Sequence, residues 1–306
     1  MSSDETWRII GKRQQGASHV FLGMPNQDDI RWDKGDDPFP WAVIAVSDGH
    51  GSPKCFRSER GASIAVEVAV NVGREFLMSQ ISRSNLPLVK VWAEEKLHQH
   101  ILDRWLEEVK EDCVRKPFSA EEPSGLDDRD RPATRRAIDE RPEIAYGATL
   151  VTCLITTGFV IYLQIGDGDI LSVSSEGEVS RPLPADPRLF ANETTSLSSK
   201  DALLDFRFGF QVISGRPPAL TLLSTDGYSN AFRDDCGFLK VGSDLLDIIR
   251  TDGPGQVEQY LPTWLKEATE TGSGDDVTLG LVIWEEVVAR LPRGTAEGGV
   301  DRAHHE

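Results

Sequence analysis

Cysteine is scarce in this sequence, and the few cysteines lie far apart. Only four occur among 306 residues (Cys55, Cys113, Cys153 and Cys236), and no two of them form a Cys-x-x-Cys pair. This spacing argues against a zinc site and against the disulfide framework of a small secreted domain. We interpret the four as reduced thiols, which predicts a cytoplasmic protein.

Long apolar runs and an excess of basic residues are also missing. No run reaches the roughly 20 residues that cross a bilayer. The opening stretch, MSSDETWRII, is polar and acidic and does not resemble a signal peptide. Lys and Arg number 33 against 50 Asp and Glu, for a net charge of −17. Because nucleic acids and many membrane surfaces are anionic, we expect neither as a partner.

Apolar residues are nevertheless plentiful enough for a large core. They make up 39% of the chain and include 7 Trp and 12 Phe. We predict a single domain over residues 1–290 and a polar, disordered tail over residues 291–306. Residues 115–143 are dense in charge and proline, which predicts a loop insertion that is either simply solvated or binds a partner.

The order of the predicted elements indicates the fold class. Helical spacing of apolar residues predicts helices over 55–80, 88–112, 242–251 and 254–270. Runs rich in β-branched and aromatic residues predict strands over 41–48, 146–156, 159–165, 170–175, 208–214, 219–224 and 277–284. Strands and helices do not alternate strictly, so we expect antiparallel sheets with helices packed outside, an α+β fold.

Four aspartates stand next to predicted strands. Asp48 follows AVIAVS, Asp167 follows FVIYLQIG, Asp226 follows ALTLLST, and Asp275 shortly precedes VTLGLVIW. Each alone is typical of a turn, but together they predict that the strand ends converge and bring their carboxylates to one rim of the fold. Such carboxylates raise one another's pKa, and a hard divalent cation relieves the repulsion. Oxygen ligands favour Mg²⁺ or Mn²⁺, and a pair of ions would suit an in-line phosphoryl displacement.

The first of these aspartates belongs to the tetrapeptide DGHG, residues 48–51. A tight turn uses Asp and Gly, but it does not need the titratable side chain of His50. Gly49 has no side chain, so its carbonyl can approach an ion closely. The tetrapeptide therefore combines a candidate metal ligand with a candidate acid catalyst.

Four motifs in this order resemble the signature of the PPM-type metal-dependent Ser/Thr protein phosphatases, the protein phosphatase 2C family. They are VSDGHG, IGDGD, LLSTDGYSN and GSGDDVTLGLV, and GASHVFLGMPNQDD resembles the opening motif of a bacterial branch. The resemblance runs from about residue 11 to 285. It implies a four-layer αββα sandwich, in which two antiparallel sheets are flanked by helices. It also implies hydrolysis of phosphoserine and phosphothreonine in proteins, within bacterial signalling and with a Ser/Thr kinase as counterpart.

The resemblance further implies Mn²⁺ or Mg²⁺ as the cofactor, with two ions and a third, weaker one. Asp48 is similar to the ligand that bridges the two metals, and Gly49 to a carbonyl ligand. Asp226 and Asp275 are similar to ligands of the second metal. Asp167 is similar to the ligand of the third.

Two further residues receive catalytic roles from the same resemblance. Asp28 is similar to an acidic residue that hydrogen-bonds water at the metals, and His50 to the general acid that protonates the departing Ser or Thr oxygen. Many members also carry a phosphate-binding Arg before the opening acidic pair, but FLGMPNQDD has none, and Gln27 replaces a common Glu. His19 is a candidate substrate contact, or else a surface histidine. The missing Arg leaves an alternative: a catalytically weak or silent member that acts as a metal- or partner-binding regulatory scaffold.

Overall fold

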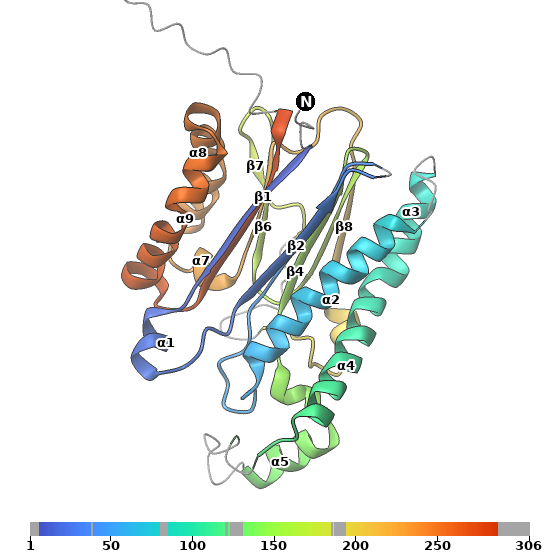
Figure 1. Cartoon of the computed structure of the whole chain (residues 1–306), viewed down its shortest axis with the longest axis vertical. Coiled ribbons are helices and arrows are strands. Elements are labelled where there is room, and N and C mark those ends of the chain that lie inside the picture. The colour runs from blue at the N-terminus through green and yellow to red at the C-terminus, as the bar shows by residue number, and fades with distance from the viewer. Residues whose placement is uncertain are drawn as a thin grey trace, which may run out of the picture.

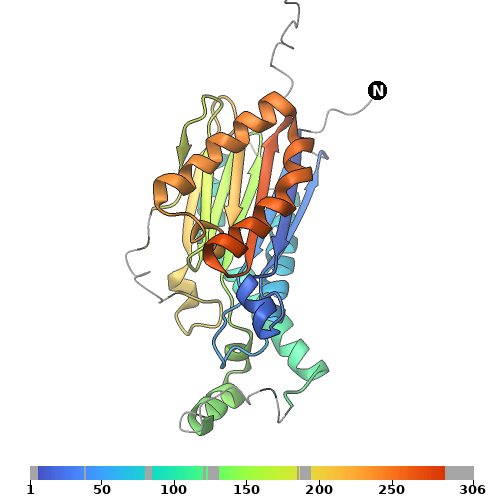
Figure 2. The ribbon, with the colours of Figure 1, turned by 90° about the vertical axis from the view of Figure 1, so that its left-hand side faces the viewer.

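Two antiparallel sheets pack face to face, and helices cover both outer surfaces (Figures 1 and 2). The structure is a computed structural model that describes residues 6–37, 39–79, 85–119, 122, 131–184, 186 and 194–286. Each sheet has five strands. This arrangement confirms the predicted α+β fold and its αββα layers. The predicted tail over 291–306 lies outside the described residues.

The first sheet has the strand order β1-β10-β9-β6-β7. Its strands are Trp7–Gln14 (β1), Val277–Trp284 (β10), Leu220–Ser224 (β9), Asp169–Val173 (β6) and Val179–Ser180 (β7). Its outer face packs against helices α8 (Asp235–Asp252) and α9 (Pro254–Ala268). A four-residue helix, α7 (Asp226–Ser229), follows β9, and a π-helical turn, Thr269–Ser273, follows α9.

The second sheet has the order β2-β3-β4-β5-β8. Its strands are Asp29–Gly35 (β2), Trp41–Ser47 (β3), Leu150–Thr156 (β4), Phe159–Ile165 (β5) and Arg207–Val212 (β8). Helices α2 (Ser58–Met78), α3 (Leu86–Trp92) and α4 (His98–Arg115) lie on its outer side, and a π-helical turn joins α3 to α4. The four-residue helix α6 (Ala202–Asp205) precedes β8.

Strand β3 shows why its sequence is apolar at every position. Its side chains alternate between the two faces of the sheet. Val43 and Ala45 pack in the cluster formed with α2 and α4, whereas Ile44 and Val46 pack in the cluster between the two sheets. A strand buried on both faces needs apolar residues throughout, so it shows a continuous run and no alternation.

Most central strands were predicted closely, although the strand predicted over 146–156 begins only at Leu150. Of the four edge strands, β8 was predicted over 208–214, whereas β1, β2 and β7 were missed. The bounds predicted for β10 match the structure, and those of β3, β5 and β9 differ by one residue at most. Strands β1 and β2 had no prediction, and each forms the outer edge of its sheet. Edge strands such as DIRWDKG carry charged side chains on their exposed positions, which weakens the apolar signal.

The prediction of a loop over residues 115–143 was wrong in part. Residues Arg131–Glu140 form helix α5, and Pro142–Tyr146 form a 3₁₀ turn. Helix α5 has a proline in its first turn, mostly good helix formers after it, and one buried anchor, Ile138. The charge density of the segment masked these signals.

Arg57, at the start of α2, contacts the first part of this insertion and Tyr146, which follows the insertion in the chain. Its guanidinium donates to the Glu122 carboxylate at 2.6 Å and to the Tyr146 hydroxyl at 2.8 Å. It also lies 4.5 Å from the centroid of the Phe118 ring. The first part of the insertion therefore meets the main fold through a partly buried polar network.

The structure also describes the cysteines and the helices on which two expectations from composition depend. All four cysteines are free thiols, and Cys55 and Cys153 are buried. Among the described residues, no helix is both long enough and apolar enough to cross a bilayer.

Candidate metal centre

Strand direction brings the predicted acidic residues to one edge of the sandwich. Strands β3 and β5 are both antiparallel to β4, so they run in the same direction and end at the same edge. Asp48 and Asp167 follow these two strand ends. In the other sheet β9 ends where its antiparallel neighbour β10 begins, which places Asp226 beside Asp275.

Three of the four carboxylates form a compact cluster. Oxygen atoms of Asp48, Asp167 and Asp226 all lie within 4.8 Å of one another. Asp275 lies close enough for its charge to raise the pKa of both Asp48 and Asp226, and its side chain is 51% exposed. Sequence reasoning had expected this convergence.

The environment of Asp48 and Asp226 disfavours their ionised forms. Burial raises the pKa of Asp48 well above its usual range, and the neighbouring aspartates add to the effect. Burial, followed by the charges of Asp167 and Asp275, raises the pKa of Asp226 to about 6. A bound cation would reverse this preference, since an opposite charge stabilises a carboxylate.

The turn that carries Asp48 is held by hydrogen bonds to Thr149 on one side and to Gln27 on the other. The Asp48 N–H donates to Thr149 Oγ1 at 3.0 Å, and the Thr149 N–H donates to the Asp48 carbonyl at 2.8 Å. The Gly49 N–H donates to the Gln27 carbonyl at 3.1 Å. A Cβ at Gly49 would lie 2.6 Å from the Ser58 carbonyl oxygen, so only glycine fits this close approach.

Asp28 supplies an observation that fits a hydrated cation site. Its Oδ2 accepts hydrogen bonds from the hydroxyls of Thr225 and Thr278, each at 2.7 Å. Its Oδ1 is buried and has no hydrogen-bond partner in the protein. Burial is the main reason that the pKa of Asp28 rises to about 8. A buried acceptor without a protein partner is the position at which a water molecule belongs, and oxygen-only surroundings suit Mg²⁺ or Mn²⁺.

His50 follows Asp48 and Gly49 in the same turn, and its side chain is largely withdrawn from water. Its N–H donates to the Gly147 carbonyl at 3.0 Å, and a Cβ at Gly147 would lie 2.8 Å from its ring carbon Cδ2. Burial, with a smaller contribution from Lys54, lowers the pKa of His50 to about 4. The imidazole is therefore neutral near pH 7 in this form of the protein.

His19 is engaged by two carboxylates. Its Nδ1 lies 2.9 Å from Asp276 Oδ2, and its Nε2 lies 3.5 Å from Asp275 Oδ1. Asp276 is buried and also accepts the N–H groups of Gly16 and Gln27, each at 2.6 Å. Sequence reasoning placed His19 near the site but missed Asp276, and the signal available for it was the doubled aspartate in GSGDD.

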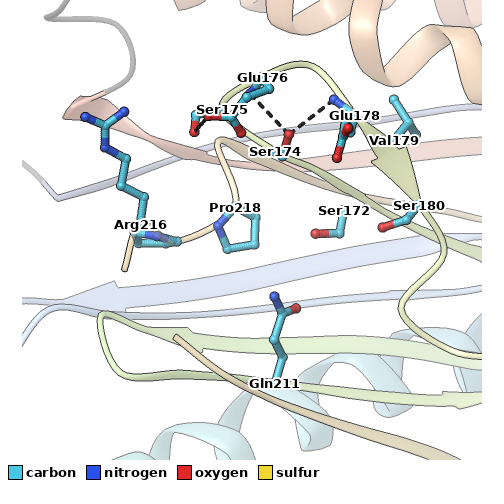
Figure 3. A pocket seen from close by; sticks show the side chains of 11 residues that line it. Ser172, Ser174, Ser175, Glu176, Glu178, Val179, Ser180, Gln211, Arg216 and Pro218 are labelled. Atoms are coloured by element: carbon cyan, nitrogen blue, oxygen red, sulfur yellow. Dashed lines mark hydrogen bonds between the residues drawn. The ribbon is translucent and has the colours of Figure 1, made fainter. Parts of the chain in front are cut away.

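Two cavities differ in their position relative to the acidic cluster. One of about 290 Å³ borders Asp167 and is also lined by Arg181 and Arg207. A larger one, about 780 Å³, lies beyond the opposite end of β6 and includes Ser174 and Arg216 (Figure 3). The larger cavity is lined by none of the predicted site residues, whereas the smaller one adjoins the acidic cluster.

Comparison with known proteins decides which family this arrangement represents. The sequence profile described as Protein phosphatase 2C matches residues 15–266. The chain belongs to the protein phosphatase 2C family. Membership makes it a protein serine/threonine phosphatase and accounts for DGHG, IGDGD and STDGYSN, which all lie inside the match. Asp275 lies beyond the matched range, although the structure brings it to the same rim.

Solved structures show the same fold. A bacterial serine phosphatase is 14% identical, with a TM-score of 0.55, over 91% of this chain and 98% of that one. The catalytic domain of the phosphatase PstP in complex with two manganese ions is 15% identical, with a TM-score of 0.54, over 90% and 97%. Stp1 from Staphylococcus aureus is 13% identical, with a TM-score of 0.56, over 90% and 94%. A search of curated proteins gives no match.

Proposed function

We propose that this protein phosphatase 2C hydrolyses phosphoserine and phosphothreonine in proteins with the help of two divalent ions at the acidic rim. The observation behind the proposal is the cluster of Asp48, Asp167 and Asp226, whose oxygens lie within 4.8 Å of one another. Such ions, when bound, polarise phosphoryl oxygens and make water nucleophilic at neutral pH. The structural relative PstP, solved with two manganese ions, supports Mn²⁺ as the first metal to test.

The residues assigned to the ions divide by position. Asp48 and the Gly49 carbonyl come from the turn after β3, and Asp226 and Asp275 come from the adjoining ends of β9 and β10. Asp167 stands beside the 290 Å³ cavity and would hold a third, weaker ion. Oxygen ligands of this kind select Mn²⁺ or Mg²⁺.

Asp28 then orients the attacking water, and His50 supplies the proton that the leaving group needs. The partnerless Oδ1 of Asp28 accepts a hydrogen bond from the attacking water and orients it, while Thr225 and Thr278 hold the other oxygen. His50 donates a proton to the departing Ser or Thr oxygen. Because its pKa is about 4 in the absence of substrate, protonation would accompany binding of the phosphate dianion, whose charge raises the pKa of a neighbouring imidazole.

The contacts of His19 distinguish between two roles, a substrate contact and the positioning of a metal ligand. A substrate contact would require the ring to face the phosphate. The contacts to Asp275 and Asp276 instead suit a positioning role, in which His19 orients a metal ligand. We assign the positioning role.

A phosphate-release assay tests the proposed function. The full chain should release phosphate from phosphoserine and phosphothreonine peptides with Mn²⁺ or Mg²⁺, and excess EDTA should abolish release. Absence of turnover despite measurable Mn²⁺ binding would instead support the silent scaffold. Asp244→Asn, at an exposed carboxylate on α8 paired with Lys240, is the matched control.

Three further points remain proposals of the same kind. Residues 1–290 form one catalytic domain with an insertion between α4 and β4. A Ser/Thr kinase that phosphorylates the same substrates is the expected functional counterpart, by family analogy. The cytoplasm is the expected location, from the reduced cysteines.

A further inference from the structure

The imidazole of His50 packs against Gly147, where the chain has no side chain. A Cβ at Gly147 would lie 2.8 Å from His50 Cδ2. The same point lies 2.9 Å from Cys55 Sγ and 3.1 Å from Ser198 Oγ. The His50 N–H also donates to the Gly147 carbonyl at 3.0 Å. Because these groups already crowd one point, a small displacement of Gly147 would move the imidazole. We call Gly147 and Cys55 the histidine seat.

Arg57 joins the two chain segments that form the histidine seat. It lies two residues after Cys55, and Tyr146 directly precedes Gly147. The Arg57 N–H donates to the Ala145 carbonyl at 2.8 Å. Its Nη1 donates to the Tyr146 hydroxyl, also at 2.8 Å. Both the main chain and the side chain of Arg57 therefore hold the segment that leads into Gly147.

Tyr146 is packed so closely that it has little room to adjust. Its side chain is fully buried, and its hydroxyl donates to Asp112 Oδ2 at 2.8 Å. A Cβ at Gly61 would lie 1.8 Å from the Tyr146 carbonyl oxygen, so α2 lies directly on the main chain at this residue. Closely packed interiors transmit strain instead of absorbing it. A change in what holds Tyr146 should therefore reach Gly147 and the imidazole beside it.

The guanidinium of Arg57 also holds the first part of the insertion. It donates to the Lys116 carbonyl at 2.6 Å and to the Pro117 carbonyl at 3.2 Å. Two of its nitrogens contact the two carboxylate oxygens of Glu122, at 2.6 and 3.0 Å. A planar guanidinium can bind such a set of acceptors at once, whereas the ammonium of a lysine cannot. One side chain thus connects the insertion with the histidine seat.

We propose that Arg57 is a positioning residue, which fixes the orientation of the His50 imidazole through Tyr146 and Gly147. The insertion contributes to this orientation through the contact of Glu122 with Arg57. The inference rests on the proposed function, because it concerns the histidine assigned to protonate the leaving group. It gives the insertion an influence on catalysis that needs no contact with the substrate.

Two substrates test the orientation of His50 through turnover. A phosphoserine peptide needs a proton on its leaving oxygen, whereas p-nitrophenyl phosphate does not. Arg57→Lys should lower kcat on the peptide about tenfold relative to kcat on p-nitrophenyl phosphate, since a small misplacement of a catalytic group is costly. Glu122→Gln retains the shape of the side chain but weakens a charge-assisted contact, and it should lower the same ratio about threefold. Both rates come from one preparation, so their ratio does not depend on the folded fraction.

An exposed ion pair of the same kind provides the matched control. Arg104 of α4 contacts both carboxylate oxygens of Glu75 on α2, at 2.9 and 2.8 Å. Arg104→Lys and Glu75→Gln should leave the ratio of the two kcat values unchanged. Where His50→Ala lowers this ratio, an unchanged ratio in either Arg57→Lys or Glu122→Gln overturns the inference.

Nuclear magnetic resonance separates failure of the inference from failure of the proposed function. The ring signals of labelled histidines in Mg²⁺ report the surroundings of each imidazole without turnover, and His50→Ala identifies the signal of His50. Arg57→Lys and Glu122→Gln should shift this signal and leave that of His100, an exposed residue of α4, in place. If His50→Ala leaves the ratio of kcat values unchanged, the acid role of His50 fails, and the ring signal alone decides the inference. A His50 signal that stays in place in both variants overturns it.

Discussion

The imidazole Nδ1 of His19 lies 2.9 Å from Oδ2 of Asp276. This contact joins helix α1 (Ala17–Leu22) to the segment immediately before β10. The Asp276 carboxylate also accepts the N–H groups of Gly16 and Gln27, which lie on either side of that helix in the chain. The other ring nitrogen faces Asp275 at 3.5 Å. His19, a candidate substrate contact or surface histidine from the sequence, is thus placed to orient Asp275, a proposed metal ligand.

His19→Ala should therefore weaken metal affinity more than phosphate binding. Loss of a group that orients a ligand typically costs about 10–100-fold in metal affinity or activity. The activation constant for Mn²⁺ should rise accordingly, while KM for p-nitrophenyl phosphate at saturating Mn²⁺ stays nearly constant. A sharp rise in that KM would instead make His19 a phosphate contact. His100→Ala, at an exposed imidazole on α4, serves as the control.

Asp48→Asn and Asp226→Asn should each nearly abolish turnover while the protein stays folded. Isothermal titration with Mn²⁺ should show lost or weakened sites. In EDTA both variants should melt at a higher temperature than the unaltered protein, since each removes a charge from a group of carboxylates within 4.8 Å. Unchanged Mn²⁺ binding in both variants would mean that the ions bind elsewhere.

His50→Ala should discriminate between leaving groups. On phosphoserine peptides, whose alkoxide leaving group needs a proton, kcat should fall by about a hundredfold or more. On p-nitrophenyl phosphate the loss should be much smaller, because nitrophenolate leaves without protonation. Equal losses on the two substrates would indicate a structural role for the imidazole beside Gly147.

The metal-free protein should lose stability as the pH rises from about 5 to 8. Asp28 and Asp226 have pKa values of about 8 and about 6 in the folded protein, above the 3.8 of an unperturbed aspartate. The folded state therefore binds more protons than the unfolded state in this range, so the free energy of unfolding falls as these protons are released. Differential scanning fluorimetry in EDTA should show a lower Tm at pH 8 than at pH 5.

Added Mn²⁺ should reverse this trend. Metal ligands bind in their deprotonated form, so the gain in Tm from Mn²⁺ should be larger at pH 8 than at pH 5. Asp28→Asn should flatten the pH dependence in EDTA, because it removes a carboxyl whose pKa is raised to about 8 by burial. A Tm in EDTA that rises from pH 5 to pH 8 would contradict the assignment.

Much of the fold was predictable from local pattern. Strands buried on both faces, such as β3 and β10, require continuous apolar runs, and such runs are visible in the sequence. The aspartates at their ends were visible for the same reason, since a carboxylate directly beside a buried strand is conspicuous. The ordered motifs then indicated the family, because each combines an acidic residue with a strand end and a glycine.

Tertiary structure alone decided which side chains support these aspartates. Thr225 and Thr278 bind one oxygen of Asp28 from positions 197 and 250 residues away. Asp276 meets His19 across 257 residues. Threonine and aspartate beside a strand have many ordinary uses, and nothing local in the sequence pairs them. The exposure of Val20, Phe21 and Leu22 was undecided for the same reason, because the sequence VFL does not reveal whether it packs in a core or faces solvent. Only the packing of the two sheets and their helices leaves these three side chains outside.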